Sequence, residues 1–362
     1  MSINSTKLIN YTTKNNIDIY STLKKKDLEK KIKNNNLKLN SQSILLSGHK
    51  SEVFTCKFSP EGTLFATAGI DKLIYIWDVF SHSNKDKCIT NLNCHTNCIL
   101  DICWVENFKL VSGSVDKSIN YWDVFKNSII RKFKSHINIV NSLDVLRYNN
   151  TTNSNNNYYS NTMVSTGEDG KVLVWDLRCK EEQLKIQKNF QLTSVKISSN
   201  SNNSGETIYF GGIDNKIYAY DLRNNHEEYI LNLHNNFHTD VIISLAVSNS
   251  GDYLISSSLD NRINLWNVKS YCSSDNSRYI NTFNGINSNF EKNLIKASWS
   301  NDDKLIASGS SDRHVYIWNV LTGQNTHKLC GHNASVNEVN FCKIENIIGS
   351  VSSDSTAIIG YY

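Results

Sequence analysis

The sequence has no apolar run that approaches the roughly 18 to 20 residues that a membrane-spanning helix needs, so we expect no transmembrane segment. Residues 1 to 40 also lack an apolar stretch between a basic start and a small-residue cleavage site, which argues against a secretory signal. The nine cysteines are odd in number and have no paired spacing, which indicates reduced thiols and not a disulfide framework. We therefore expect a protein that stays inside the cell and folds around a large core.

Charge is spread unevenly along the chain. Residues 1–43 carry nine Lys against three acidic residues, a net charge of +6, so the remainder of a chain with net charge +4 carries −2. A net charge of −2 on the remainder is not typical of proteins that bind nucleic acid mainly through its phosphates. The basic extension could still add a weak, salt-sensitive contact with RNA. The lysine run from Lys24 to Lys33 fits a solvated extension, and it also fits a nuclear-import signal.

An internal repeat organises the rest of the sequence. An aromatic residue followed by Asp or Asn recurs at steps of 45, 53, 45, 46 and 52 residues, at Trp77, Trp122, Trp175, Tyr220, Trp266 and Trp318. Six residues before each of these aromatics is an Asp, and a seventh Asp precedes Gly360 by the same interval. We call these residues the turn aspartates: Asp71, Asp116, Asp169, Asp214, Asp260, Asp312 and Asp354. The sequence therefore contains seven units.

Each unit predicts four short strands. The segment Leu64–Trp77 alternates apolar and polar residues on both sides of a turn, and similar runs precede and follow it at Val53–Phe58 and Cys88–Leu92. With a Gly-His start, a Trp-Asp end and a period near 45, the pattern resembles the WD40 repeat, whose units form the blades of a β-propeller. The resemblance implies an all-β, seven-bladed WD40 propeller over 43–362, preceded by a basic Lys/Asn-rich extension at 1–42.

The two ends of the chain predict how the ring closes. The last unit stops at its third strand, 357–362, while one surplus strand, Gln42–Leu46, precedes the first Gly-His pair. We expect this surplus strand to complete the last blade and to leave no open sheet edge. The Asn/Ser-rich insertions 148–161, 199–204 and 271–278 should fall in loops between strands.

The WD40 resemblance also implies a buried chain of hydrogen bonds in which Trp, Ser or Thr, His and Asp follow in series. Four blades contain the full set, namely His49, Thr67, Asp71 and Trp77; His95, Ser112, Asp116 and Trp122; His136, Ser165, Asp169 and Trp175; and His238, Ser256, Asp260 and Trp266. Blades four and six lack the His, blade four also has Phe210 and Tyr220 for Ser and Trp, and blade seven has Gly360 for Trp. We expect those three blades to rely on packing and to have the lowest local stability.

Two chemical alternatives arise from the same residues. Ser, His and Asp together also describe a hydrolase triad, but the trio recurs in several blades and an indole caps each hydroxyl, so we expect no enzyme. Zinc is the second alternative, from the cluster Cys88, Cys94, His95, Cys98 and Cys103. The cluster has no Cys-x-x-Cys pair and His95 is committed to its blade, so ordinary buried thiols are the better interpretation and we expect neither metal nor cofactor.

Three stretches carry a finer resemblance within the WD40 proteins. They are Leu46–Phe58, Gly211–Arg223, and 289–313, where Asn-Phe-Glu-Lys-Asn-Leu replaces the usual Gly-His start. In these stretches the chain resembles the WD-repeat subunits of the U5 small nuclear ribonucleoprotein. That resemblance implies a non-enzymatic scaffold of the spliceosome that acts in pre-mRNA splicing. It also implies a nuclear protein, bound as a monomer within a large complex to spliceosomal proteins, chiefly the large U5 scaffold protein, with no membrane contact.

A second class of function stays open. The segments 175–178 and 220–223 read Trp-Asp-Leu-Arg and Tyr-Asp-Leu-Arg. They resemble the boxes by which WD40 substrate receptors dock onto a cullin-RING ubiquitin ligase.

A partner surface is expected on the narrow face around the channel, at residues just before the turn aspartates and at the start of each first strand. These are Glu52, Glu168, Asp240, Phe290, Glu291, Lys292, Asn293 and Ser311. Phe290, Glu291 and Lys292 stand where a structural His would otherwise be, and an aromatic beside charges suits a protein interface. The alternative is that Phe290 fills the space left by the missing His.

Overall fold

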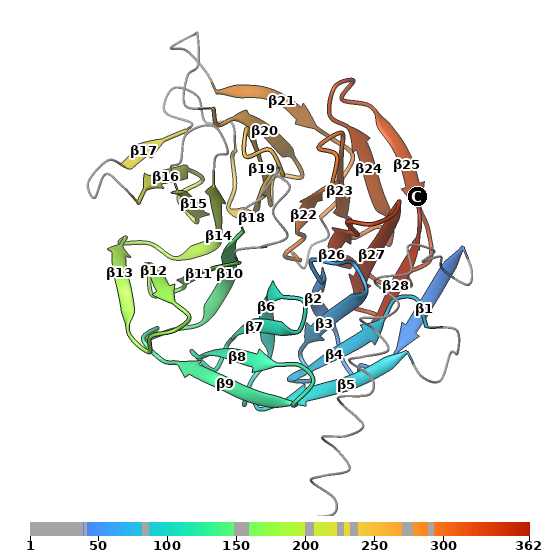
Figure 1. Ribbon diagram of the computed structural model, residues 1–362. Helices are drawn as coiled ribbons and strands as arrows, with labels where there is room; N and C mark the ends of the chain where they lie inside the picture. Colours follow the sequence, from blue (N-terminus) through green and yellow to red (C-terminus); the bar gives the residue numbers. More distant parts are fainter. Residues whose placement is uncertain are drawn as a thin grey trace, which may run out of the picture.

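The computed structural model describes residues 39, 42–81, 87–147, 159–199, 206–222, 228–231, 238–269, 278–288 and 293–362. Within this part of the chain, 28 strands form seven four-stranded sheets. Figure 1 shows the sheets as blades around a common centre, with the first strand of each blade innermost and the fourth outermost. Among the described residues, no helix has the length and apolar character needed to cross a bilayer.

Blades one to four follow the sequence order. Blade one contains β2 (Val53–Phe58), β3 (Leu64–Gly69), β4 (Leu73–Asp78) and β5 (Cys88–Asn93). Blade two contains β6 (Ile99–Glu106), β7 (Lys109–Ser114), β8 (Ile119–Asp123) and β9 (Ser128–Phe133). Blade three contains β10 (Val140–Arg147), β11 (Tyr159–Gly167), β12 (Lys171–Asp176) and β13 (Glu182–Gln187). Blade four contains β14 (Leu192–Ser199), β15 (Glu206–Gly212), β16 (Ile217–Asp221) and β17 (Glu228–Ile230).

The last three blades complete the ring. Blade five contains β18 (Ile242–Val247), β19 (Tyr253–Ser258), β20 (Ile263–Asn267) and β21 (Tyr279–Phe283). Blade six contains β22 (Ala297–Trp299), β23 (Leu305–Gly309), β24 (Val315–Asn319) and β25 (Asn325–Leu329). Blade seven contains β26 (Val336–Phe341), β27 (Ile347–Ser352), β28 (Thr356–Tyr361) and β1 (Ser43–Ser47). The fold class and the number of blades expected from the repeat are confirmed.

The surplus strand closes the ring in the way the sequence predicts. β1 pairs antiparallel with β28, from Ser43 opposite Gly360 to Ser47 opposite Thr356 (Figure 1). The side chains of Ile44 and Leu46 are buried, and they join the core between blades seven and one. Gly360 stands where other blades have Trp, and a Cβ there would lie 3.2 Å from the Gln42 carbonyl oxygen, so the absent side chain gives β1 room.

Hydrophobic alternation places the core between the blades. In β3, Leu64, Ala66 and Ala68 pack toward blade two, whereas Phe65 packs into the cluster shared with blade seven. Successive residues of a strand point to opposite faces, so every sheet contributes apolar side chains to both neighbours. Seven such clusters occupy the seven interfaces between adjacent blades. The ring is therefore held by a circular series of small cores.

The expected boundaries are refined at a few points. Leu39, inside the expected extension, is buried in the core between blades seven and one, and its N–H donates to the Tyr361 hydroxyl at 2.9 Å. The placement of residues 1–38 lies outside the described residues, so the division at residue 42 stays a prediction. Most of the three Asn/Ser-rich insertions also lies outside them. Tyr159 to Asn161 were expected in a loop, but they form the start of β11, because the strand extends to pair Tyr159 with Arg147.

Candidate functional site

The ring has two faces, and the turn aspartates lie on one of them. This face, which we call the turn-Asp face, is formed by the loops between the second and third strands of each blade and by the connections from one blade to the next. The opposite face is formed by the loops between first and second strands and between third and fourth strands. The expected partner residues all belong by sequence position to the turn-Asp face.

Four blades bring the implied hydrogen-bond chain together. In blade two the Trp122 indole donates to the Ser112 hydroxyl at 2.8 Å, Ser112 is 2.7 Å from Nε2 of His95, and Nδ1 of His95 is 2.9 Å from Asp116. Blades one, three and five repeat the arrangement with His49, Thr67, Asp71 and Trp77; His136, Ser165, Asp169 and Trp175; and His238, Ser256, Asp260 and Trp266. Each of these hydrogen-bond series connects the third strand of a blade, through its second strand, to the loop that enters its first strand.

The turn aspartate also organises the surrounding backbone. Asp116 accepts hydrogen bonds from the N–H of Thr96, in the loop that enters the blade, and from the N–H of Ser118, within the turn. Burial acts to raise the pKa of Asp116, but hydrogen bonds from His95 and Ser118 outweigh it and hold the pKa well below its usual value. The carboxylate is therefore a structural anion that fastens two loops of the turn-Asp face.

This geometry does not present a nucleophile. The Ser112 hydroxyl is fully buried, and the Trp122 indole takes the side of the oxygen that a reacting carbon would have to approach. A hydrolase serine needs an open position next to its oxygen and a donor set for an oxyanion. The Ser-His-Asp trio is thus part of the blade framework.

Blades four and six replace the missing His with a tyrosine. The hydroxyl of Tyr218 donates to Asp214 at 2.5 Å, and that of Tyr316 donates to Asp312 at 2.5 Å. Each tyrosine stands four residues after its turn aspartate, next to the site that the absent imidazole leaves open. The expectation that these blades rely on packing alone is therefore wrong.

Blade seven keeps the His, Ser and Asp of the hydrogen-bond series but lacks the Trp indole. Its His332 lies 2.9 Å from Ser350 and 3.2 Å from Asp354. Because Gly360 replaces the tryptophan, the Ser350 hydroxyl has no indole donor, and the space is used by β1.

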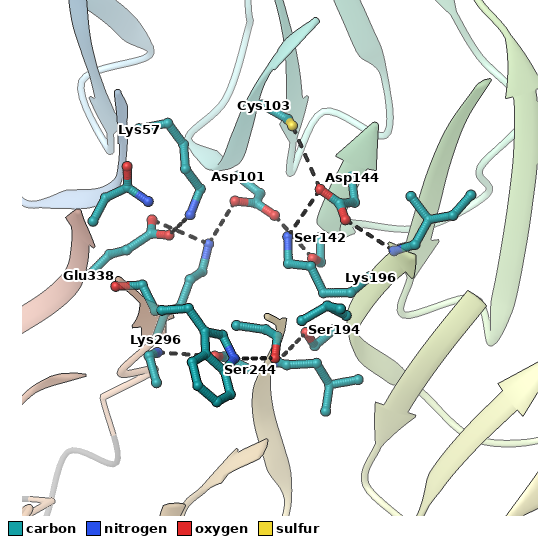
Figure 2. Close-up of a pocket in the computed structure, with 18 of the residues that line it drawn as sticks. Lys57, Asp101, Cys103, Ser142, Asp144, Ser194, Lys196, Ser244, Lys296 and Glu338 are labelled. Carbon is teal, nitrogen blue, oxygen red and sulfur yellow. Dashed lines mark hydrogen bonds and ion pairs between the residues drawn. The ribbon is translucent and has the colours of Figure 1, made fainter. Parts of the chain in front are cut away.

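The centre of the ring is a cavity lined by residues from, or next to, the first strands of all seven blades. Figure 2 shows that its charged side chains form ion pairs across blade boundaries. Lys57 pairs with Glu338, Lys296 with Asp101 at 3.0 Å, and Lys196 with Asp144 at 3.5 Å. Burial acts to lower the pKa of Lys57, but Glu338 and Asp101 raise it above the usual value, so this lysine stays charged. The three cations and three anions balance, which leaves no net charge for a ligand.

Side chains around the cavity cover the inner edges of five of the seven sheets. In each case a side-chain oxygen of one blade accepts a hydrogen bond from a backbone N–H in the first strand of the next blade, at 2.9–3.1 Å. The N–H of Leu143 donates to Asp101, that of Ile197 to Asp144, that of Leu245 to Ser194, that of Ala297 to Ser244 and that of Cys56 to Glu338. Unpaired strand edges are a liability that side-chain partners remove. The side chains that line the cavity therefore hold neighbouring blades together.

The expected partner residues have different environments. Glu52 is exposed, Glu168 and Asp240 are half-buried, and Glu168 accepts a hydrogen bond from Asn138 at 3.2 Å. Asn293 is half-buried, and its amide donates to Ser335 of blade seven at 2.9 Å.

Ser311 is only 5% exposed, so its side chain does not belong to an open surface. Its short side chain does not reach past its neighbours, whereas the isoleucines at the same turn position in blades one and four do. Phe290, Glu291 and Lys292 lie outside the described residues.

Exposed aliphatic side chains on the turn-Asp face were missed. Ile70 is 39% exposed, Ile137 67%, Ile213 45% and Leu294 55%, and all four lie in loops of this face. Ile70 and Ile213 immediately precede turn aspartates, and Ile137 immediately follows the structural His136. These fixed repeat positions were the signal that could have identified them, because the repeat places both positions at the surface. These residues belong to different blades around one face, and together with the charged residues there they make this face the candidate interaction surface.

The structure also places residues of the candidate zinc site and of the two Asp-Leu-Arg boxes. Among the four candidate zinc-binding cysteines, Cys103 is buried, Cys88 and Cys98 are half-buried, and Cys94 is exposed, so the interpretation as buried thiols is wrong for Cys94. Both ring nitrogens of His95 are occupied by Asp116 and Ser112. In the segment 175–178, the exposed Arg178 pairs with Asp176 at 2.7 Å, whereas Arg223 of the second box lies outside the described residues.

Comparison with known proteins identifies relatives along most of the chain. The family model "WD domain, G-beta repeat" matches residues 40–78, 86–123, 127–176, 229–267 and 284–319. The pre-mRNA-splicing factor cwf17 of Schizosaccharomyces pombe is 34% identical over 89% of this chain and 88% of its own length. The U5 small nuclear ribonucleoprotein 40 kDa protein of Dictyostelium discoideum is 36% identical over 89% of this chain and 85% of its own length. Its human counterpart is 35% identical over 89% and 84%.

Proposed function

The chain belongs to the WD40-repeat family of the U5 small nuclear ribonucleoprotein 40 kDa proteins, and from this we propose that it is a non-enzymatic scaffold subunit of the U5 particle in pre-mRNA splicing. The observation that carries the proposal is the similarity over 89% of this chain and 84–88% of the relatives' lengths. Such a subunit works among spliceosomal partners and in the nucleus.

The turn-Asp face is the docking surface in this proposal. Its exposed aliphatic residues Ile70, Ile137, Ile213 and Leu294 share this face with the charged Glu52 and Glu168. Mixed apolar and charged surface is typical of non-obligate protein interfaces. The large U5 scaffold protein is the partner that we assign to this face, and Phe290 and Lys292, which precede Leu294 in the sequence, would add an aromatic anchor and a charge to it.

No structural observation favours the ubiquitin-ligase alternative. The Arg178 guanidinium is held by the neighbouring Asp176 carboxylate, so its charge is already partly compensated. Binding of a cullin and its adaptor is therefore treated as one possible result of the test below, and we do not propose it as a second function.

The docking surface is tested by co-purification of U5 components from nuclear extract with matched variants. We expect Ile70→Glu combined with Ile213→Glu to reduce recovery of U5 RNA and proteins several-fold, because charged side chains would replace exposed apolar contacts. Replacing both Phe290 and Lys292 with Ala should act in the same direction. The control is Leu321→Glu, since Leu321 is 89% exposed on the opposite face.

Melting temperatures separate docking from folding in this experiment. All variants should melt within about 4 °C of the unaltered protein, the shift expected for about 1 kcal/mol in a large domain. Equal recovery of U5 components with both face variants and the control would contradict docking through the turn-Asp face. A large fall in melting temperature for the Phe290 variant would place that side chain in the core.

A further inference from the structure

A basic cleft lies on the turn-Asp face between blades two and three. It is lined by Asp116, Lys117 and Ser118 of the β7–β8 turn, by Lys132 in β9 and Lys134 just after it, and by Thr96 and His136 of the loops that enter blades two and three. Lys117 and Lys134 are exposed, and Lys132 is half-buried. Three positive charges therefore gather around one depression in the surface.

The charges of these lysines are not neutralised within the described part of the chain. None of the three forms an ion pair there, whereas Lys57, Lys196 and Lys296 of the central cavity are all paired. The one carboxylate in the cleft is that of Asp116, which already receives hydrogen bonds from His95, Thr96 and Ser118. The cleft thus presents a net positive charge to an incoming group.

The turn position of Lys117 repeats in every blade. Lys117 has a φ of 67°, in the left-handed region, and the equivalent positions of the other blades hold Lys72, Gly170, Asn215, Asn261, Arg313 and Ser355 with φ of 63–73°. Gly and Asn adopt this conformation readily, whereas other residues lose roughly 1 to 2 kcal/mol there. The conformation is therefore a property of this turn in every blade, and in blade two the residue that adopts it brings a cation to the cleft.

An apolar contact lies beside the charges. Ile137 directly follows His136, which lines the cleft, and its side chain is 67% exposed. A ligand that crosses the cleft can therefore place anions near the lysines and an aliphatic group against Ile137.

We propose that this cleft binds an acidic peptide segment of a protein partner, with carboxylates on Lys117, Lys132 and Lys134 and an aliphatic side chain on Ile137. RNA fits less well, because the cleft has no exposed aromatic residue on which a base could stack and the chain beyond residue 43 carries a net charge of −2. The segment 1–43 of this chain is also a poor occupant, since its net charge of +6 would be repelled.

The test measures binding of two fluorescent probes to the purified full chain by anisotropy. One probe is a ten-residue peptide of glutamates around a central leucine, and the other is a ten-nucleotide oligouridylate. The cleft variant carries Lys117→Glu, Lys132→Glu and Lys134→Glu. Its matched control carries Lys24→Glu, Lys25→Glu and Lys26→Glu, which change the net charge equally outside the propeller.

We expect the peptide to bind the unaltered chain, and the cleft variant to bind it at least tenfold more weakly than the tail control does. Ile137→Ser should weaken the peptide severalfold without changing net charge. Lys117→Asn with Lys134→Gln keeps the turn geometry and β9 intact, and it should lose most of the affinity with an unchanged melting temperature. Absence of peptide binding, equal losses in the cleft variant and the tail control, or tighter cleft-dependent binding of oligouridylate would each overturn the proposal. None of these results depends on assembly with U5 components, so the test is separate from that of the proposed function.

Discussion

At the scale of single residues, the turn aspartates have several partners at once. Asp71, Asp116, Asp169 and Asp260 each hold an imidazole, a backbone N–H of the loop entering the blade, and a backbone N–H inside the turn. Removal of such a carboxylate leaves buried donors without a partner, and that cost exceeds the net gain of a single hydrogen bond.

Asp116→Ala should therefore lower the free energy of unfolding by about 1 to 3 kcal/mol, because His95 loses its carboxylate partner. The measurement is urea denaturation followed by tryptophan fluorescence. Glu181→Ala is the matched control, since the exposed Glu181 makes no side-chain contact among the described residues, and it should cost under about 0.5 kcal/mol. Asp302 is a poorer control, because it accepts hydrogen bonds from Ser300 and Lys304. Matching midpoints for the two variants would argue against a buried network.

The tyrosine substitution in blade six gives a second prediction at this scale. Tyr316→Phe removes only the hydroxyl that donates to Asp312, and we expect it to lower the free energy of unfolding by about 1.5 to 3 kcal/mol, the range for hydrogen bonds to charged groups. Tyr253→Phe is the control, because no hydrogen bond from its hydroxyl occurs within the described residues. If the two variants unfold at the same urea concentration, the hydroxyl of Tyr316 does not replace the missing imidazole.

Blades four and six show where the sequence interpretation fell short. Neither blade has a His at the position equivalent to His95, yet each carries a tyrosine that stands four residues after its turn aspartate and donates to it. Blade one has Tyr75 at the same position together with His49, and its ring packs edge-on against the imidazole at 4.5 Å. The residue type was visible in the sequence, but the replacement depends on the reach of the side chain across the sheet, which a linear pattern does not express.

At the scale of elements, β1 has the greatest influence on the whole ring. It covers the edge of β28, and it buries Ile44 and Leu46 between blades seven and one. Counting strands was sufficient to predict this pairing. The last unit is one strand short, and one surplus strand precedes the first unit. Pairing the two is the arrangement that leaves no open sheet edge. Ser311 was predicted less well, since exposure at a turn depends on side-chain length and on neighbouring loops.

Truncation tests the closing strand. Deleting residues 1–47 should destabilise the protein by at least about 3 kcal/mol, because two buried aliphatic side chains are each worth roughly 1.5 to 3 kcal/mol. Deleting residues 1–38 keeps Leu39, its bond to Tyr361 and all of β1, so the melting temperature should change little. Similar melting temperatures for the two truncations would contradict closure by β1.

At the scale of the whole molecule, the buried titratable groups act together. In six of the turn aspartates burial acts to raise the pKa, but hydrogen bonds outweigh it and lower the pKa values of Asp71, Asp116, Asp169, Asp260, Asp312 and Asp354. Burial lowers the pKa of His332, which favours its neutral form in the folded protein. All of these groups bind protons more tightly in the unfolded chain, so stability is lost as the pH falls.

The expected pH profile follows from those directions. The urea midpoint should be nearly constant above about pH 7, decline slightly below about pH 6.5 as His332 begins to favour the unfolded state, and fall steeply below about pH 4. Denaturation at pH 7.5, 5.5, 4.5 and 3.5 measures it. A midpoint that stays level or rises on acidification would show that the folded protein does not hold these aspartates as anions.

Assembly with the U5 particle is the central claim, and affinity purification of the full chain from its own cells tests it most directly. We predict that U5 RNA will be among the most enriched RNAs and that splicing proteins will co-purify. After ribonuclease treatment the large U5 protein should remain bound, because the proposed contact is between proteins. Enrichment of a cullin and its adaptor without U5 RNA, or loss of every protein partner with the RNA, would contradict the account.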